Sequence, residues 1–357
     1  MVNNNGTDAR LVWLDYCKTI AITLVILFHS GLVTCKITVP LLAMCVPLFF
    51  VANGALVLRR ERGVWYFVHK LFKILFVIVF WGALSDIITM LLNNEPLNVV
   101  DIVFAGFSFK YGYTHHLWFL GTLFVLYTIY PAIQSSMKNR GVAFFLLMAS
   151  FLFSFQAFGY RLPTFEMPNI LAFWHGEAFF YSILGCIVVR HVFIDTSTNP
   201  MRIGLSMMMG KRHTGDFLKV NKRFVIIILV SLFVTLWIGQ LFMFVGPKFF
   251  TRHTPVDNDA AVFLLYKSPF VMLMVGVVVV LLKTLNLSRN RFVEFIGSST
   301  LGMYVSHGVF MSLSRTFVMF CDTRVINMVT FVSGFVLSLL FTWVMSKNKF
   351  LSFFITL

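Results

Sequence analysis

Residues 11–33 read LVWLDYCKTIAITLVILFHSGLV, an apolar run that contains one lysine and one histidine. About 20 such residues, rising ~1.5 Å each as an α-helix, cross the roughly 30 Å hydrocarbon core of a bilayer. Lys18 and His29 are about three helical turns apart, so their side chains share one face with about 16 Å between them. Ionisable residues inside a span are costly to desolvate and commonly mark a functional site.

The rest of the chain is also rich in apolar residues and poor in charged ones. Of its 357 residues, 59% are hydrophobic and 12% are charged, and the mean hydropathy is +0.85. Soluble domains carry about 25% charged residues, so the composition predicts an all-α polytopic membrane protein. We expect a single transmembrane domain over residues 1–357. About ten transmembrane helices are predicted, at roughly 11–33, 39–58, 67–92, 117–136, 142–158, 170–190, 223–246, 264–283, 295–318 and 325–346.

The formal net charge of +15 is distributed by topology. Lysine and arginine gather in alternate connections, at 59–73, 138–140, 190–223, 283–291 and 347–349. This alternation obeys the positive-inside rule and predicts that both termini are cytoplasmic. The basic charge therefore indicates membrane lipids as neighbours and gives no reason to expect a nucleic-acid partner.

Residues 191–222 form the longest polar insert, which is basic and rich in methionine. We expect a basic cytoplasmic loop here, either as a helix lying on anionic lipid or as an irregular segment. The five cysteines show no pairing pattern and are interpreted as small buried hydrophobic residues.

The predicted topology sorts the ionisable residues of the spans into two layers. The inner layer is cationic and contains Lys18, Lys70, Lys73, Arg59, Arg60 and Arg62. The outer layer contains His29, Asp86, His116, His175, Glu177 and His307. A cationic mouth suits a polyanionic ligand such as a nucleotide phosphate. A layer of histidines and carboxylates suits proton transfer near neutral pH.

Several of these residues have structural alternatives. Lys70 and Lys73 are also typical of simple anchoring at the inner face, and Lys18 has Asp15 one turn away as an ion-pair partner. Intramembrane histidines and carboxylates also serve proton-coupled transporters and glycan flippases. The chain has no paired, interrupted helices in corresponding halves, which are the usual sign of a transport site.

Five motifs occur in order along the chain and resemble those of one known family. They are Lys18, ten residues and His29; Val46-Pro-Leu-Phe-Phe-Val-Ala-Asn53-Gly54; Lys70-x-x-Lys73; His116-Leu-Trp118-Phe-Leu; and Gly297-Ser-Ser-Thr-Leu-Gly-Met-Tyr304-Val-Ser-His307. Together they make the chain similar to the acyltransferase-3 family of bacterial inner-membrane acyltransferases.

The resemblance implies a membrane-bound O-acyltransferase that is multi-pass in the bacterial inner (cytoplasmic) membrane. It implies an acyl-CoA donor bound from the cytoplasm, acetyl-CoA or another short acyl-CoA such as succinyl-CoA. It also implies an acceptor hydroxyl outside, on a surface glycan or its lipid-linked precursor. No metal is expected. Direct transfer and an acyl-histidine intermediate both remain open.

The resemblance implies that His29 is essential to catalysis, and we expect it to act as general base. Either Asp86 or Glu177 is expected to orient its imidazole. The expected donor-binding residues are Lys18, Lys70 and Lys73. The expected substrate-binding residues are His116, Trp118, Tyr304 and His307.

The chain departs from the family pattern at three places. The typical Arg-x-x-Arg is Lys70-x-x-Lys73 here, and a lysine offers phosphate a point charge in place of a bidentate fork. Asn53 stands where serine is usual, and Leu123 stands where many longer relatives have a glutamate.

Overall fold

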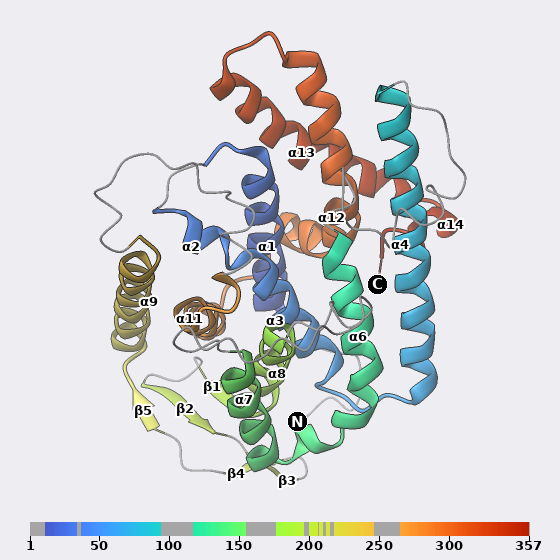
Figure 1. Cartoon of the computed structure of the whole chain (residues 1–357). Helices are drawn as coiled ribbons and strands as arrows, with labels where there is room; N and C mark the ends of the chain where they lie inside the picture. The colour runs from blue at the N-terminus through green and yellow to red at the C-terminus, as the bar shows by residue number, and fades with distance from the viewer. Residues whose placement is uncertain are drawn as a thin grey trace.

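The computed structural model describes residues 11–33, 37–93, 117–154, 176–195, 200–205, 207–209, 212–214, 218–245 and 265–356. Its helices are α1 (Val12–Ser30), α2 (Val39–Leu42), α3 (Cys45–Val57), α4 (Val64–Asn93), α6 (Trp118–Ile133), α7 (Arg140–Ser154), α8 (Gly176–Arg190), α9 (Lys222–Val245), α11 (Pro269–Leu285), α12 (Arg291–Val318), α13 (Thr323–Ser346) and α14 (Lys349–Ser352), with one 3-10 turn at Ser136–Lys138. Its strands are β1 (Val192–Asp195), β2 (Met201–Leu205), β3 (Met207–Met209), β4 (Arg212–Thr214) and β5 (Leu218–Val220). Figure 1 shows the arrangement.

Five of the described helical segments have the length and hydropathy to cross a membrane. They are Val12–Ser30, Val39–Val57, Val64–Ile88, Lys222–Phe242 and Thr323–Ser346. Three shorter apolar helices accompany them, at Trp118–Ile133, Arg140–Leu152 and Pro269–Leu285. The predicted class, a helical membrane protein, is confirmed, whereas ten spans and two cytoplasmic termini stay predictions.

The described part of the segment 191–222 contains five short strands, and its assignment as a basic cytoplasmic loop stays a prediction. Strands β1, β2 and β5 form an antiparallel sheet in that order, with Val192 opposite Leu205 and Met201 opposite Val220. Strands β3 and β4 form a second antiparallel pair. The prediction of a helix on the lipid surface is therefore wrong over these strands. The β-branched and methionine residues pair locally, which a count of basic charge does not reveal.

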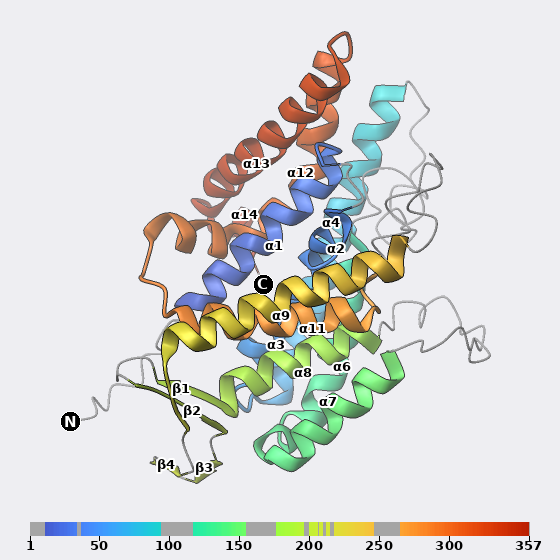
Figure 2. The ribbon, with the colours of Figure 1, turned by 90° about the vertical axis from the view of Figure 1, so that its left-hand side faces the viewer.

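The sheet lies at one end of the helical bundle, and the α12–α13 connection lies at the other (Figures 1 and 2). Helix α1 runs from the sheet end toward that connection. Lys18 in the first half of α1 is therefore nearer the sheet, and His29 in its last turn is nearer the α12–α13 connection.

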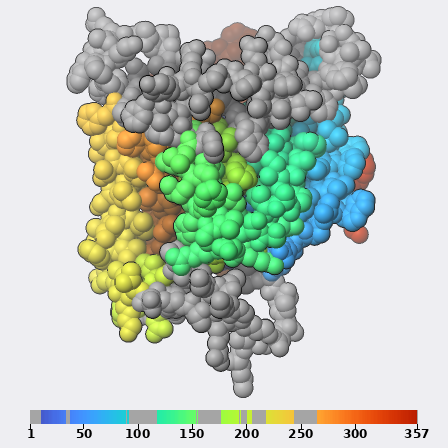
Figure 3. All heavy atoms as spheres, turned by 60° about the horizontal axis from the view of Figure 1, so that its bottom comes forward, coloured from blue at the N-terminus to red at the C-terminus, as the bar shows by residue number. Residues whose placement is uncertain are grey.

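Helix α3 lies at the centre of the bundle and α9 at its edge. In the apolar window containing α3, 83% of residues are buried, against 11% in α9. Figure 3 shows α9 in yellow along the margin of one lateral face. Large apolar side chains of α9 that are exposed include Ile227, Ile228 and Phe242, as expected of a helix that faces lipid.

The contact between α3 and α8 depends on two glycines. A Cβ atom on Gly54 would lie 1.9 Å from the carbonyl oxygen of Ser182, and one on Gly185 would lie 2.0 Å from that of Val51. Only a residue without a side chain permits such backbone approach, as in other small-residue contacts between membrane helices. Helix α3 in turn packs on α1, which packs on α12 and α13.

Candidate active site

His29 and His307 form a pair of imidazoles between α1 and α12. Their ring centroids are 5.4 Å apart, and the side chain of His307 is buried. Nδ1 of His307 lies 2.6 Å from the carbonyl oxygen of Tyr304. Because a carbonyl oxygen only accepts, we assign the proton of neutral His307 to Nδ1, which leaves Nε2 as an acceptor.

The last turn of α1 is held by side chains from two other helices. Gly31 ends α1 in the left-handed conformation, at φ 69°. Arg315 of α12 donates from Nη2 to the carbonyl oxygen of His29 at 2.8 Å. Asn327 of α13 donates from Nδ2 to the carbonyl oxygen of Gly31, also at 2.8 Å. These bonds satisfy carbonyl groups that a helix end leaves without an intrahelical partner and fix the backbone that carries His29.

Lys18, on the same helix, makes an ion pair and lines a cavity. Its Nζ lies 3.2 Å from Oδ1 of buried Asp15, so the predicted pairing one turn away is present. A Cβ atom on Gly297 would lie 3.0 Å from that same oxygen. The glycine of the late motif thus lets α12 pass close to α1 beside the Asp15–Lys18 pair.

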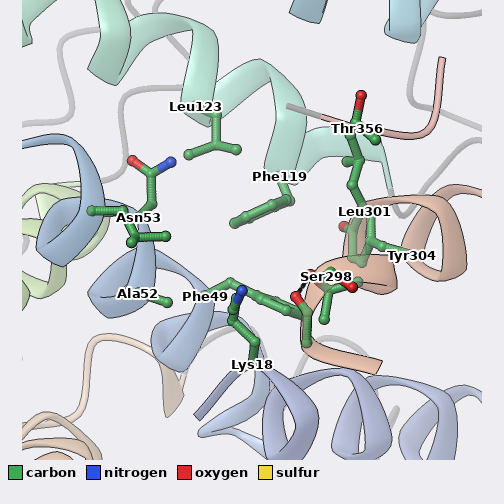
Figure 4. Close-up of a pocket in the computed structure, with 13 residues that line it drawn as sticks. Lys18, Phe49, Ala52, Asn53, Phe119, Leu123, Ser298, Leu301, Tyr304 and Thr356 are labelled. Atoms are coloured by element: carbon green, nitrogen blue, oxygen red, sulfur yellow. Dashed lines mark hydrogen bonds between the residues drawn. The ribbon is translucent and has the colours of Figure 1, made fainter. Parts of the chain in front are cut away.

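The cavity has a volume of about 330 Å³, within the roughly 300–1,000 Å³ typical of ligand pockets. It is enclosed by α1, α3, α6, α12 and a residue after α14 (Figure 4). Its polar lining residues are Lys18, Asn53, Ser298, Thr300, Tyr304 and Thr356.

Tyr304 lies between the cavity and the histidine pair. It lines the cavity, and its ring centroid is 5.9 Å from that of His307. Its ring also contacts Phe119 at 5.2 Å and Phe49 at 6.1 Å, and both phenylalanines line the cavity. A group in the cavity would therefore meet an aromatic wall before reaching His307 and His29.

Asn53 extends the site into a buried hydrogen-bond network. Its Nδ2 donates to the hydroxyl of Tyr127 at 3.1 Å, and its Oδ1 accepts from the hydroxyl of Tyr130 at 3.0 Å. The Tyr130 hydroxyl also lies 2.9 Å from Oγ of Ser182. The network joins α3, α6 and α8, and the cavity wall at Asn53 is rigid because both ends of its amide are engaged.

The lysines of the third motif have different surroundings. Nζ of Lys73 donates to Oγ1 of Thr356 at 3.1 Å, which connects it to the cavity wall. Nζ of Lys70 lies 5.5 Å from the ring centroid of Tyr66, a ring that Arg62 also covers at 4.2 Å. The structure therefore brings Lys73 to the cavity through Thr356, whereas Lys70 packs with Tyr66.

Arginines in the connection before α4 add to this cationic cluster. Burial lowers the pKa of the Arg59 guanidinium from its ordinary value, and the charge of Arg62 lowers it further. The Arg59 guanidinium stays charged because an arginine pKa begins far above neutrality. Like charges held together in this way favour an anionic ligand.

A family model described as an acyltransferase domain matches residues 11–347. The chain belongs to the acyltransferase-3 family. No curated protein and no solved structure matches the chain.

The match to the acyltransferase-3 family includes all five motifs described above. The structure brings some of their residues together and leaves others apart. Tyr304, His307 and His29 lie together between α1 and α12, and Lys18 lines the cavity that Tyr304 also lines. Trp118 begins α6 and its ring lies 5.9 Å from that of Tyr266. His116, together with His175 of the predicted outer layer, lies outside the described residues.

The two candidate carboxylates of this acyltransferase lie on other helices. Asp86 is in α4, and Glu177 is buried in the first turn of α8. Glu177 at this place also interacts favourably with the α8 dipole. Their role in orienting His29 stays a prediction. Among the described residues, no three His, Cys, Asp or Glu side chains are grouped to hold a metal ion.

Sequence reasoning assigned no role to three residues of this site, Asn53, Arg315 and Thr356. Two features of the sequence could have indicated the Asn53 network: an amide side chain in an apolar helix, and two tyrosines three residues apart at 127 and 130. The sequence shows Arg315 as a charged residue within a predicted span. It does not show that Arg315 bonds to a backbone carbonyl of α1. Thr356 lies after the last apolar helix, and no motif marks it.

Proposed function

We propose that this acyltransferase-3 protein moves an acetyl, or a succinyl, group from cytoplasmic acyl-CoA to a hydroxyl of a surface glycan or its lipid-linked precursor. In this proposal the chain forms one transmembrane domain of ten spans in the bacterial inner membrane, with both termini and residues 191–222 cytoplasmic. The observation that carries it is an arrangement along α1 and α12: Lys18 and Tyr304 line the cavity, and the Tyr304 ring contacts His307, which pairs with His29.

The donor is proposed to bind with its phosphates at the lysine end. Lys18 and Lys73 lie at or beside the cavity, and the arginines before α4 raise the local positive potential. Acyl-CoA has phosphates at one end and a thioester at the end of a long, thin arm. The roughly 16 Å rise of α1 between Lys18 and His29 is a separation that such an arm spans.

His29 is proposed to act as general base. Its imidazole takes the proton of the acceptor hydroxyl as that oxygen bonds to the thioester carbonyl carbon, and the carbon–sulfur bond then breaks. The imidazolium returns the proton to the departing thiolate, so the CoA thiol leaves and His29 is neutral again. General-base catalysis of this kind contributes about 10²–10⁴-fold. The alternative mechanism is that His29 itself attacks the thioester and forms an acyl-histidine intermediate.

His307 is the orienting group that the contacts support most directly. With its proton on Nδ1, its Nε2 can accept a hydrogen bond from the second ring nitrogen of His29, which fixes the tautomer of the base. Asp86 and Glu177 remain proposed members of the same outer layer, and His116 and Trp118 remain proposed contacts of the acceptor.

Binding of acetyl-CoA to the purified, detergent-solubilised protein tests this function. We expect saturable binding that is lost in the double variant Lys70→Ala/Lys73→Ala and kept in His29→Ala. In membranes, His29→Ala should lower incorporation of radiolabelled acetyl groups into glycan by about 10²–10⁴-fold.

Two outcomes contradict the proposal. If folded protein binds neither acetyl-CoA, succinyl-CoA nor free CoA, the donor assignment is wrong and a proton-coupled transporter becomes the better explanation. If His29→Ala binds donor and transfers acetyl groups at the wild-type rate, His29 is not the base.

A further inference from the structure

The chain turns back on the bundle after α13. Asn348 caps α14 by accepting from the backbone N–H groups of Phe350 and Leu351. The residues that follow α14, 353–356, then pack against α4 and α12 (Figures 1 and 2). We call residues 349–356 the C-terminal segment.

Side chains of α4 anchor this segment. Nε1 of Trp81 donates to the carbonyl oxygen of Phe354 at 3.1 Å, and the ring of Phe80 lies 4.3 Å from that of Phe354. Ile355 is buried, and a Cβ atom on Gly302 of α12 would lie 3.0 Å from its Cβ. The C-terminal segment is therefore docked by specific contacts on two helices.

Docking brings two residues of the segment to Lys73. Oγ1 of Thr356 donates to the carbonyl oxygen of Ser352 at 2.8 Å and accepts from Nζ of Lys73 at 3.1 Å. The Phe353 ring faces the same Nζ at 4.9 Å. An ammonium has three N–H donors, so the bond to Thr356 and the contact with Phe353 restrict the direction of the others without using them.

Thr356 also lines the cavity, across from Asn53 (Figure 4). We propose that Thr356 is a positioning residue that holds the Lys73 ammonium at the cavity mouth for a phosphate of the acyl donor. This proposal rests on the proposed function and adds to it a donor-binding contribution from the C-terminal segment. A free lysine side chain loses rotamer entropy when it is fixed, and a preoriented one loses less on binding.

The test compares donor affinities of purified full-length variants in detergent. Thr356→Val removes the hydroxyl and keeps the shape of the side chain, and Thr356→Ser restores the hydroxyl. Thr235→Val is the matched control, because Thr235 is exposed on α9 and its hydroxyl likewise donates to a carbonyl four residues back. The probes are acetyl-CoA, which carries phosphates, and S-acetylpantetheine, which carries none.

We expect Thr356→Val to weaken acetyl-CoA binding by about three- to tenfold, the effect of one hydrogen bond. Binding of S-acetylpantetheine should not change, and Thr356→Ser and Thr235→Val should bind acetyl-CoA like wild type. In a Lys73→Met background, Thr356→Val should cause no further loss, because the two residues act as one unit.

The inference is overturned if wild type binds acetyl-CoA and Thr356→Val binds it equally well. It is also overturned if both probes weaken together, or if the losses in the double variant multiply, because either result means general damage to the cavity. If wild-type protein does not bind acetyl-CoA, the proposed function itself is contradicted. This outcome differs from those that overturn only the role of Thr356, because in those the wild type still binds acetyl-CoA.

Discussion

At the scale of single residues, the site depends on how His29 is held. The side chain faces His307, while its own backbone carbonyl accepts from Arg315. A general base must keep its nitrogen within hydrogen-bond reach of the proton that it removes, so small shifts of its backbone are costly. Arg315 is therefore expected to affect the chemical step although it lies on the backbone side of His29.

Replacing Arg315 by methionine should lower the rate of acetyl transfer in membranes about tenfold, the effect of one charge-assisted hydrogen bond on a barrier. Acetyl-CoA affinity should stay at the wild-type value, because Lys18 lies toward the other end of α1 and Lys70 and Lys73 lie on α4. The measurement is transfer rate beside binding affinity for each variant.

Arg324→Met is the matched control. Arg324 is exposed at the start of α13, and its backbone N–H bonds to Asp322. A wild-type transfer rate in Arg315→Met would show that the guanidinium does not position His29.

At the scale of elements, the close contact between α3 and α8 sets one wall of the site. Asn53 on α3 precedes Gly54, and the Ser182 hydroxyl at the end of the Asn53 network belongs to α8. Separating the two backbones would thus displace the cavity wall together with the helices.

Gly185→Ala should destabilise the protein by about 1–3 kcal/mol, as overpacking of a well-filled core does. The added Cβ would lie 2.0 Å from a backbone oxygen, so the helices themselves must move. Thermal unfolding in detergent measures the effect as a lower midpoint.

Gly276→Ala on α11 is the control for this change. Its Cβ would lie 3.8 Å from Leu184 Cδ2, an ordinary contact, and alanine favours a helix over glycine by about 1 kcal/mol. We expect an unchanged or higher midpoint there. Equal midpoints for Gly185→Ala and wild type would mean that α3 and α8 are less closely packed than described.

At the scale of the whole molecule, orientation in the membrane decides which substrate reaches which end of α1. The sheet of β1, β2 and β5, which carries Arg202 and Lys219, lies at the opposite end of the bundle from the α12–α13 connection (Figures 1 and 2). The positive-inside rule predicts that the sheet is cytoplasmic and that the α12–α13 connection therefore lies outside.

Cys321 in that connection reports this orientation. It is exposed, whereas Cys17, Cys45 and Cys186 are buried. With Cys35 replaced by serine, a membrane-impermeant maleimide should label Cys321 in intact cells.

A cysteine placed in the sheet is the control for the labelling. Lys219→Cys, with both Cys321 and Cys35 replaced by serine, should be labelled only after the membrane is permeabilised. The reverse pattern would invert the topology and place the lysine end of the cavity outside, where no acyl-CoA is expected.

The sequence by itself determined the class of the molecule and the spacing of two candidate site residues along one helix. Hydropathy identifies membrane segments because the bilayer requires long apolar helices whatever their neighbours. The spacing of Lys18 and His29 determines their shared face because helical geometry is local. The ordered motifs were sufficient to suggest the family that the match over residues 11–347 confirms.

Only the tertiary structure decided which groups from distant segments meet. The pairing of His29 with His307, the bond from Arg315 and the docking of Thr356 on Lys73 join residues more than 270 positions apart. Such contacts depend on how helices pack, and in a lipid-facing protein polarity alone does not specify that packing. The strands in 191–222 escaped prediction for a related reason, because their pairing depends on the register of short segments more than on composition.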